Sequence, residues 1–319
     1  MSDKRSGSAA ASYAEIDEEY AGQRLDNFLL GSLKGVPRSH VYRLVRSGQV
    51  RVNSRRVGPG YRIRAGDRIR IPPVRRTAQP LVQRPAGIDL DWLAQRIVFE
   101  DERIVLLDKP AGLAVHGGSG VNLGCIEALR LLRPEARSLE LVHRLDRATS
   151  GCLLIAKRRS ALRALHEILR AHRMHKYYLA LAAGSWPRKL RRVDQALTKA
   201  TAGAQARVRV DADGKPSVTF FEPLARFGNV ATLLGVRLET GRTHQIRVHA
   251  AAAGHPLGGD PRYGSERFNA ELANLGLGRL FLHAATLSFR WPQTDEYFGV
   301  SVPLPQELRV VVNKLARRY

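Results

Sequence analysis

The 319-residue chain has little cysteine and no long apolar run. Its two cysteines, Cys125 and Cys152, match no zinc or redox spacing, which argues against a disulfide scaffold and a structural metal and suits a reducing compartment. No run of about 18 apolar residues could cross a membrane, and residues 1–20 lack the apolar core of a signal peptide. We therefore expect a cytoplasmic protein without metal, led by a disordered segment over residues 1–20.

Acidic residues are also scarce, with 29 Asp and Glu against 52 Lys and Arg and a net charge of +23. Such an excess points to a polyanionic partner, and nucleic acid is the first candidate. Residues 21–76 alone hold 14 Lys and Arg against two acids, which accounts for +12 of the total. Because almost no acids interleave there, a nucleic-acid-binding face is favoured over an ordinary solvated surface.

This basic segment has the pattern of two helices and a small sheet. Apolar residues at helical spacing are Leu25, Phe28, Leu29, Leu33 and, after Pro37, Val41, Leu44 and Val45. Gly48 stands where a C-terminal helix cap belongs. Short alternating segments predict strands over residues 50–52, 61–64 and 68–71. Three arginines are left for another face of the second helix: Arg38, Arg43 and Arg46.

The segment resembles the S-four RNA-binding fold through Gln23–Asp26, Gly48–Asn53 and Ala65–Asp67. The resemblance implies a domain over residues 21–76 whose helix arginines, Arg38, Arg43 and Arg46, bind RNA phosphates without reading much sequence. Prolines without a sustained period then predict a linker over residues 77–92. A larger domain follows over residues 93–319.

Strands outnumber helices in this larger domain. We expect strands over residues 103–107, 152–156, 177–182, 206–210, 217–221 and 231–239. One helix should bury Leu162, Leu165, Ile168 and Leu169, and Thr243 could cap another that runs to Ala253. Because crossover helices do not alternate with the strands, the fold class is α+β with a mixed, largely antiparallel sheet.

The sequence lacks the motifs of several common classes of enzyme. No phosphate-binding loop, zinc-protease helix or zinc-deaminase pattern occurs. Residues 115–124 match poorly the glycine-rich turn that a methyl donor needs, so RNA methyl transfer is a weak alternative. The basic segment alone also suits a non-catalytic RNA-binding or ribosome-assembly protein.

The polar loop from His143 to Gly151 precedes a buried strand and holds Asp146 between Arg144 and Arg147. These arginines, with Arg247 as a possible third partner, would keep Asp146 a carboxylate. By the residues alone, an aspartate beside arginines is more often a structural ion pair than a catalytic group. The small residues 149–151 would let a ligand approach the backbone.

The same loop, His143–Gly151, resembles the signature of the RluA/RluC/RluD family of RNA pseudouridine synthases. Three further segments agree with that family: Lys109–Leu113 with Val115 and His116, Lys176–Leu181, and Thr240–His249 with Gly259-Asp260 and Tyr263-Gly264. Residues 33–37, 115–120 and 132–142 look most like the RluC type, which acts on large-subunit (23S) ribosomal RNA. Ala148 departs from the family, where an acid is usual.

The resemblance implies an isomerase that turns uridine into pseudouridine without cofactor or metal, after flipping the base into a pocket. It assigns catalysis to Asp146, either by attack on the ribose or by proton abstraction. Arg247 would hold this acid ionised, Tyr178 would stack on the base, and Ile246 would form an apolar wall. Arg144 would contact the nucleotide's phosphates or enter the vacated stack. The expected partner is large-subunit ribosomal RNA, and the expected oligomeric state is a monomer.

Overall fold

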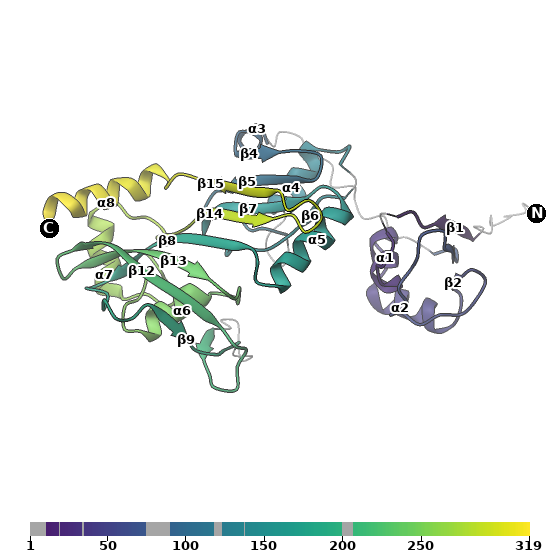
Figure 1. Cartoon of the computed structure of the whole chain (residues 1–319), viewed down its shortest axis with the longest axis horizontal. Coiled ribbons are helices and arrows are strands. Elements are labelled where there is room, and N and C mark those ends of the chain that lie inside the picture. The colour runs from purple at the N-terminus through teal and green to yellow at the C-terminus, as the bar shows by residue number, and fades with distance from the viewer. Residues whose placement is uncertain are drawn as a thin grey trace, which may run out of the picture. The chain divides into compact units, whose positions relative to one another are not determined.

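The computed structural model describes residues 11–18, 20–33, 35–74, 90–117, 123–136, 138–199 and 207–319. The chain divides between residues 88 and 89 into two compact units (Figure 1). The first ten residues of the expected leader and residues 77–89 of the expected linker lie outside the described residues. So do Lys34, Arg137, residues 118–120 of the RluC-like segment, and residue 206 of one expected strand.

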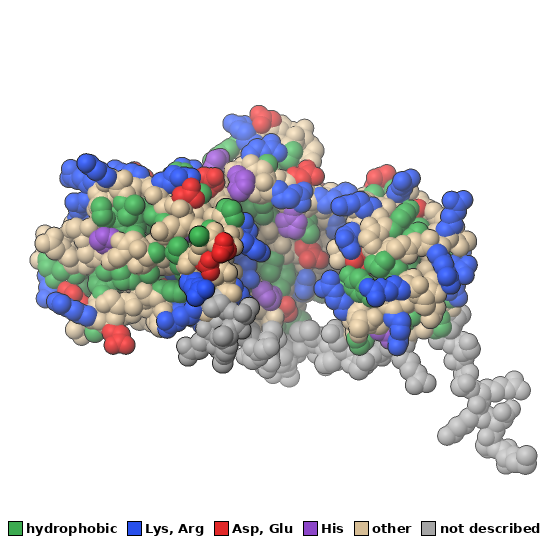
Figure 2. Space-filling model, turned by 90° about the horizontal axis from the view of Figure 1, so that it is seen from below, with side chains coloured by type: hydrophobic (Ala, Val, Ile, Leu, Met, Phe, Trp, Pro, Cys, Tyr) green, Lys and Arg blue, Asp and Glu red, His purple; other side chains and the backbone are tan. Residues whose placement is uncertain are grey.

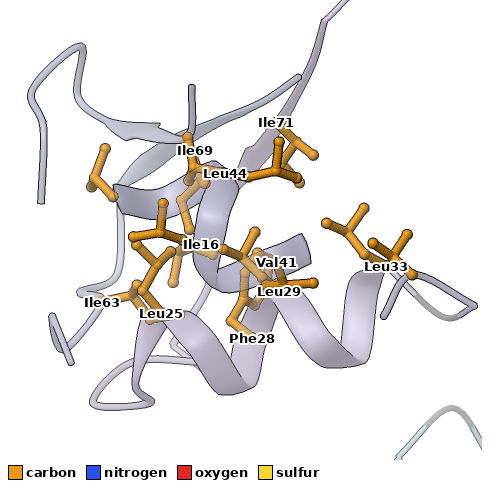
Figure 3. Close-up of a cluster of buried hydrophobic side chains, with 14 residues drawn as sticks. Ile16, Leu25, Phe28, Leu29, Leu33, Val41, Leu44, Ile63, Ile69 and Ile71 are labelled. Atoms are coloured by element: carbon orange, nitrogen blue, oxygen red, sulfur yellow. The ribbon is translucent and has the colours of Figure 1, made fainter. Parts of the chain in front are cut away.

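The first unit packs two helices on a three-stranded antiparallel sheet. The helices are α1 (Leu25–Ser32) and α2 (Arg38–Arg46). The strands are β1 (Ser12–Glu15), β2 (Arg51–Val52) and β3 (Arg68–Ile71), in the order β1-β3-β2. All seven apolar residues predicted to face inward are buried, together with strand residues such as Ile69 (Figure 3).

The end of α2 confirms the role of Gly48. Its φ of +71° is left-handed, its N–H donates to the Val45 carbonyl, and the next N–H, of Gln49, donates to Leu44. These two bonds form a Schellman ending, which a residue with a Cβ would strain.

Two expectations for this unit are wrong. Residues 12–15 of the expected leader form β1, whose backbone pairs antiparallel with β3 from Ser12↔Ile71 to Glu15↔Arg68. Residues 61–64 form no strand. Their backbone instead bonds to the turn before α1, where Leu25 donates to Tyr61 and Ile63 donates to Gln23.

The second unit is built on a ten-stranded sheet with the order β4-β5-β7-β14-β8-β13-β12-β9, in which β15 also pairs with β14 and β6 with β7 (Figure 1). Its strands are β4 (Ile97–Glu100), β5 (Ile104–Lys109), β6 (Glu140–Leu141), β7 (Ser150–Ala156), β8 (His175–Ala183), β9 (Arg192–Asp194), β12 (Val218–Phe227), β13 (Ala231–Leu238), β14 (Leu282–Arg290) and β15 (Tyr297–Ser301). A separate hairpin joins β10 (Leu197–Lys199) to β11 (Val208–Val210). All pairings are antiparallel except β7 with β14, so the mixed, largely antiparallel sheet is confirmed.

Six helices accompany this sheet: α3 (Asp91–Ala94), α4 (Cys125–Leu132), α5 (Arg159–Arg170), α6 (Gln245–Ala252), α7 (Glu266–Asn274) and α8 (Gln306–Arg318). In α5 the buried face centres on Ala161, Ala164, Leu165 and Ile168, so Leu162 and Leu169 are only half-buried. The expected cap by Thr243 is wrong. Helix α6 starts after His244, and the Gln245 side chain holds the preceding turn by accepting from Thr240 and from the Arg242 N–H.

Strand β14 lies between β7 and β8, although it comes more than 100 residues later than either start. Ala284 of β14 is in register with Gly151 on one side and with Tyr178 on the other. The two segments that carry the expected catalytic aspartate and stacking tyrosine are therefore held at a fixed spacing by a strand that contributes neither.

Candidate active site

A pocket of about 480 Å³ opens where three segments of the second unit meet: the loop before β7, the start of β8, and the turn between β13 and α6. Its volume is in the range of small-ligand sites. The expected site residues of this unit all line it: Arg144, Asp146, Tyr178, Ile246 and Arg247. The fold thus brings together residues that are up to 103 positions apart in the sequence.

Asp146 meets Arg247 at the wall of this pocket. Arg247 Nη1 lies 3.4 Å from Asp146 Oδ2, and the Asp146 side chain is 16% exposed. The other edge of the guanidinium is bound more tightly, because its Nε and Nη2 each lie 2.8 Å from a carboxylate oxygen of Asp260. Asp260 is fully buried and also accepts the N–H groups of Arg262 and Tyr263.

The charges of this cluster support one another. Burial acts to raise the pKa of Asp260, but the hydrogen bonds and charge of Arg247 together with the backbone N–H groups of Arg262 and Tyr263 outweigh it, and the net pKa is lowered. Burial likewise acts to lower the pKa of Arg247, and the bonds and charges of both aspartates raise it. Arg247 therefore stays a fixed cation that Asp260 orients and that Asp146 faces.

Tyr178 and Ile246 supply the apolar surfaces of the pocket. Tyr178 is buried on β8, and burial together with the charge of Asp146 raises the pKa of its phenol well above the usual value. Its ring is therefore neutral at physiological pH. Ile246 lies in the first turn of α6 and is buried as well. A flat, uncharged ring could pack between such surfaces.

His244 adds a group that the sequence did not single out. It has a left-handed backbone with a φ of +56°, and its Nε2 lies 3.8 Å from Asp146 Oδ2. Its Nδ1 is 2.9 Å from the hydroxyl of Tyr263. Burial lowers the pKa of His244, although the Asp146 carboxylate acts to raise it, so the imidazole is neutral at pH 7. Arg247 also lies over the Tyr263 ring, 5.0 Å from its centre.

Lys109, the last residue of β5, holds the loop that carries Asp146 through hydrogen bonds to backbone carbonyls. Lys109 is fully buried, and its Nζ donates to the carbonyls of Pro110, Leu113 and Arg147 at 2.8, 2.8 and 3.2 Å. The Arg147 side chain does not pair with Asp146 as expected, because it donates to the Gly112 carbonyl at 2.7 Å. Among the described residues, Arg247 is the arginine whose side chain pairs with Asp146.

The small residues 149–151 lie where the loop that carries Asp146 enters β7. Thr149 and Ser150 are buried, and Ser150 bonds to His283 and Arg279. Gly151 has a φ of +107°, and a Cβ there would lie 2.2 Å from the Ala284 carbonyl oxygen. The small size of Gly151 lets β14 pack closely against this segment, while Thr149 lines the pocket.

The remaining expected residues are exposed cations. Arg144 lies exposed at the pocket. Arg38, Arg43 and Arg46 are exposed on α2 of the first unit, and Arg38 and Arg46 lie 5.7 and 6.0 Å from the ring centre of Tyr42. Figure 2 shows Lys and Arg side chains spread widely over the visible face of that unit.

Asp260 and Lys109 were missed as site residues. Both stood inside segments that carry the family resemblance, and each had a signal of its own. Lys109 is a cation directly after the apolar run Ile104–Leu107 and Asp108, and Asp260 directly follows the pair Gly258-Gly259. Neither signal says which backbone or side chain will be the partner. Among the described residues, no group of three or more His, Cys, Asp or Glu is placed to hold a metal ion, and no helix is long and apolar enough to span a membrane.

Comparison with known proteins gives consistent results. Residues 103–252 match the family model described as RNA pseudouridylate synthase, and residues 23–69 match the S4 domain. The ribosomal large subunit pseudouridine synthase C of Yersinia pestis is 53% identical over 296 residues, 92% of each chain. The protein of that name from Escherichia coli (strain K12) is 50% identical over 309 residues, 94% of this chain and 95% of its own. The structure of human RNA Pseudouridylate Synthase Domain Containing 4 has the same fold, with a TM-score of 0.59, 24% identity, and coverage of 71% of this chain and 95% of its own.

Proposed function

Because this chain belongs to the RNA pseudouridylate synthase family and is closely similar to its synthase C members, we propose that it isomerises specific uridines of 23S (large-subunit) ribosomal RNA, with Asp146 as the catalytic residue. Family membership makes the protein an isomerase with an S4 domain. It sets aside both methyl transfer and a purely non-catalytic role. The RNA target, the catalytic aspartate and base flipping are the proposed parts.

The observation that carries this proposal is the ion pair of Asp146 with an arginine that is already held by Asp260. Arg247 cannot rotate away without leaving Asp260 unpaired in the interior. It therefore keeps a cation beside Asp146 before substrate arrives, and such fixed charges need no rearrangement during the reaction.

The chemistry requires one bond to break and one to form. The bond between uracil N1 and ribose C1′ breaks, uracil turns, C5 bonds to C1′, the C5 proton leaves and N1 gains a proton. Atoms and electrons are conserved, so the reaction consumes no co-substrate. A carboxylate can start it by adding to C1′, as in glycosidases, or by removing the proton on C2′. Of the two carboxylates that line the pocket, Asp146 is the partly buried one and pairs with Arg247, whereas Glu239 is exposed, so we assign either route to Asp146.

The other pocket residues have matching roles in this proposal. The neutral Tyr178 ring stacks on the uracil, and Ile246 forms the apolar wall opposite the polar cluster. A base inside a duplex cannot reach Asp146, so the nucleotide flips into the pocket. Exposed Arg144 then contacts the phosphates or occupies the vacated stack.

The S4 unit supplies affinity rather than chemistry. Its exposed Arg38, Arg43 and Arg46 are suited to phosphate contacts, which fix position and carry little sequence information. We propose in addition that the protein acts as a monomer in the cytoplasm, where ribosomal RNA is assembled.

The test is Asp146→Asn, which removes the charge and keeps the shape. With in vitro transcribed 23S RNA labelled with tritium at uridine C5, each isomerisation releases one tritium to water. We expect tritium release to fall to background while RNA affinity stays within a few fold. Primer-extension stops after carbodiimide treatment map the positions.

A matched control is Asp295→Asn, because Asp295 is an exposed carboxylate that pairs with Arg290 and does not line the pocket. Its activity should equal that of the wild type. Undiminished release by Asp146→Asn would refute the catalytic assignment, and release from small-subunit RNA alone would refute the substrate.

A further inference from the structure

Lys176 is a pocket residue that the proposed reaction leaves without a role. It lies on β8 two residues before Tyr178, so both side chains point to the same face of the strand. It lines the pocket and is only half-exposed, and burial lowers the pKa of its ammonium group. Its Nζ lies beside the loop between β13 and α6, 3.5 Å from where a Cβ of Gly241 would be.

The surroundings of Lys176 differ from those of the other buried cations. Lys109 donates to three carbonyls, and Arg247 binds two carboxylates. In the described part of the chain, no hydrogen bond or ion pair reaches Lys176 Nζ. Partial desolvation of an ammonium group without a partner is unfavourable. An anion bound in the pocket would remove that cost.

The charge around Lys176 identifies the kind of anion. Three further basic side chains line the pocket with Lys176, and all are exposed: Arg170, His172 and Arg242. Two carboxylates are among the described lining residues: Asp146, which pairs with Arg247, and Glu239, which is exposed and whose backbone carbonyl lies 2.6 Å from His172 Nδ1. A compact, highly charged anion suits this cluster better than a neutral base.

We propose that Lys176 binds a backbone phosphate of the nucleotide whose base stacks on Tyr178. This rests on the proposed function, since it requires a nucleotide in the pocket. Two residues of a strand span about 7 Å, so Lys176 lies well to one side of the ring of Tyr178. At that distance from the stacked ring, Lys176 serves binding rather than bond cleavage.

The lack of a side chain at Gly241 is part of this site. Its backbone can approach both the ammonium group and an RNA phosphate. A carboxylate at position 241 would lie next to Lys176 Nζ and compete with the phosphate. Gly241 has a backbone that other residues can adopt, and a Cβ would make only an ordinary contact. Gly241→Asp is therefore a second, independent variant.

The experiment measures tritium release and RNA affinity for Lys176→Met, Lys176→Arg and Gly241→Asp on 23S transcript. For Lys176→Met we expect the KM to rise roughly 10- to 100-fold, as loss of a charged hydrogen bond implies. The single-turnover rate at saturating RNA should change less than threefold. The slope of log affinity against log salt should decrease in magnitude by about 0.7 to 0.9, which corresponds to one phosphate. Lys176→Arg should restore most of the affinity, and Gly241→Asp should reproduce the rise in KM.

The control is Lys189→Met, which removes an exposed lysine that does not line the pocket. A fall in the saturating rate with KM unchanged would overturn the proposal, and so would a rise in KM without a change in salt slope, which would indicate a base contact. If the wild-type protein releases no tritium, the proposed function fails. If the wild type is active and Lys176→Met matches Lys189→Met, only the present inference fails.

Discussion

Arg247 binds two aspartates, and we predict that one of them maintains stability and the other activity. Asp260→Asn removes the carboxylate that grips the guanidinium through two bonds of 2.8 Å. Asp146→Asn removes the carboxylate at 3.4 Å, which is 16% exposed and makes one bond. The two substitutions are chemically identical and act on the same cation, so their difference reports geometry alone.

The magnitudes follow from burial. Arg247 and Asp260 side chains are 7% and 0% exposed. Breaking such a pair by removing one partner costs about 3 to 5 kcal/mol, because the remaining charge is buried without compensation. After Asp146→Asn, Arg247 still has Asp260, and the lost contact is long and partly hydrated. Its loss should therefore cost no more than about 1 kcal/mol.

Urea unfolding of both variants measures this difference. For Asp260→Asn the free energy of unfolding should fall by about 4 kcal/mol, which for a domain of this size lowers Tm by roughly 10 °C. Its tritium release should also fall, because Arg247 is no longer oriented. Asp146→Asn should unfold within about 1 kcal/mol of wild type and release no tritium. Equal destabilisation by both would refute the reasoning, since it would mean that the two ion pairs are equivalent.

Three further predictions concern other parts of the molecule. In urea unfolding, Gly151→Ala should destabilise the protein by about 3 to 5 kcal/mol, because its Cβ would meet the Ala284 carbonyl oxygen at 2.2 Å in a left-handed backbone. The control Gly254→Ala has a φ of +82° and open space around the Cβ, so it should cost only about 1 kcal/mol. Similar losses for the two variants would contradict the packing described for β14. Burial lowers the pKa of His143 to about 3, so the folded state resists its protonation. The neutral His143 therefore contributes its full stabilisation above the unfolded pKa of 6.5, and this stabilisation is lost by about 1.4 kcal/mol per pH unit as the pH falls toward 3. In urea titrations at several pH values, His143→Gln should make the free energy of unfolding depend less steeply on pH over that range. Changing Arg38, Arg43 and Arg46 together to Gln should weaken RNA binding in a filter-binding assay and reduce the magnitude of the slope of log affinity against log salt by about 2 to 3. The single-turnover rate at saturating RNA should stay near that of the wild type. An unchanged slope would mean that these arginines do not contact RNA phosphates.

The sequence pattern predicted those helices and turns that are determined by interactions between residues close together in the chain. The helical spacing of α1 and α2 and the glycine after α2 were visible because one face of each helix is buried in its own small core. Strand β1 was not visible, since its partner β3 lies about 55 residues further on and its own side chains are mostly exposed. The turn before α6 was misread because a glutamine inside the helix, not the threonine before it, holds the turn.

The sequence predicted the residues proposed to react or bind substrate, but not the residues that hold them in place, such as Asp260 and Lys109. Asp146, Tyr178 and Arg247 stood in segments that resemble a known family. Whether an arginine next to an aspartate in sequence also lies next to it in space depends on where its side chain finds an acceptor. Arg147 found the Gly112 carbonyl, and Arg247, 101 positions from Asp146, faces it. Such pairings depend on tertiary contacts that no local pattern encodes.

Because β14 comes late in the sequence, the pocket is completed late during synthesis of the chain. Every residue assigned to the pocket chemistry precedes residue 261, yet the edges of β7 and β8 that carry the loop and the tyrosine stay unpaired until residues 282–290 leave the ribosome. A nascent chain that already contains all reacting groups therefore lacks the strand that spaces them. We therefore expect catalysis only after β14 has been synthesised, and we expect a truncation before β14 to give an inactive protein with two open strand edges, which favour aggregation.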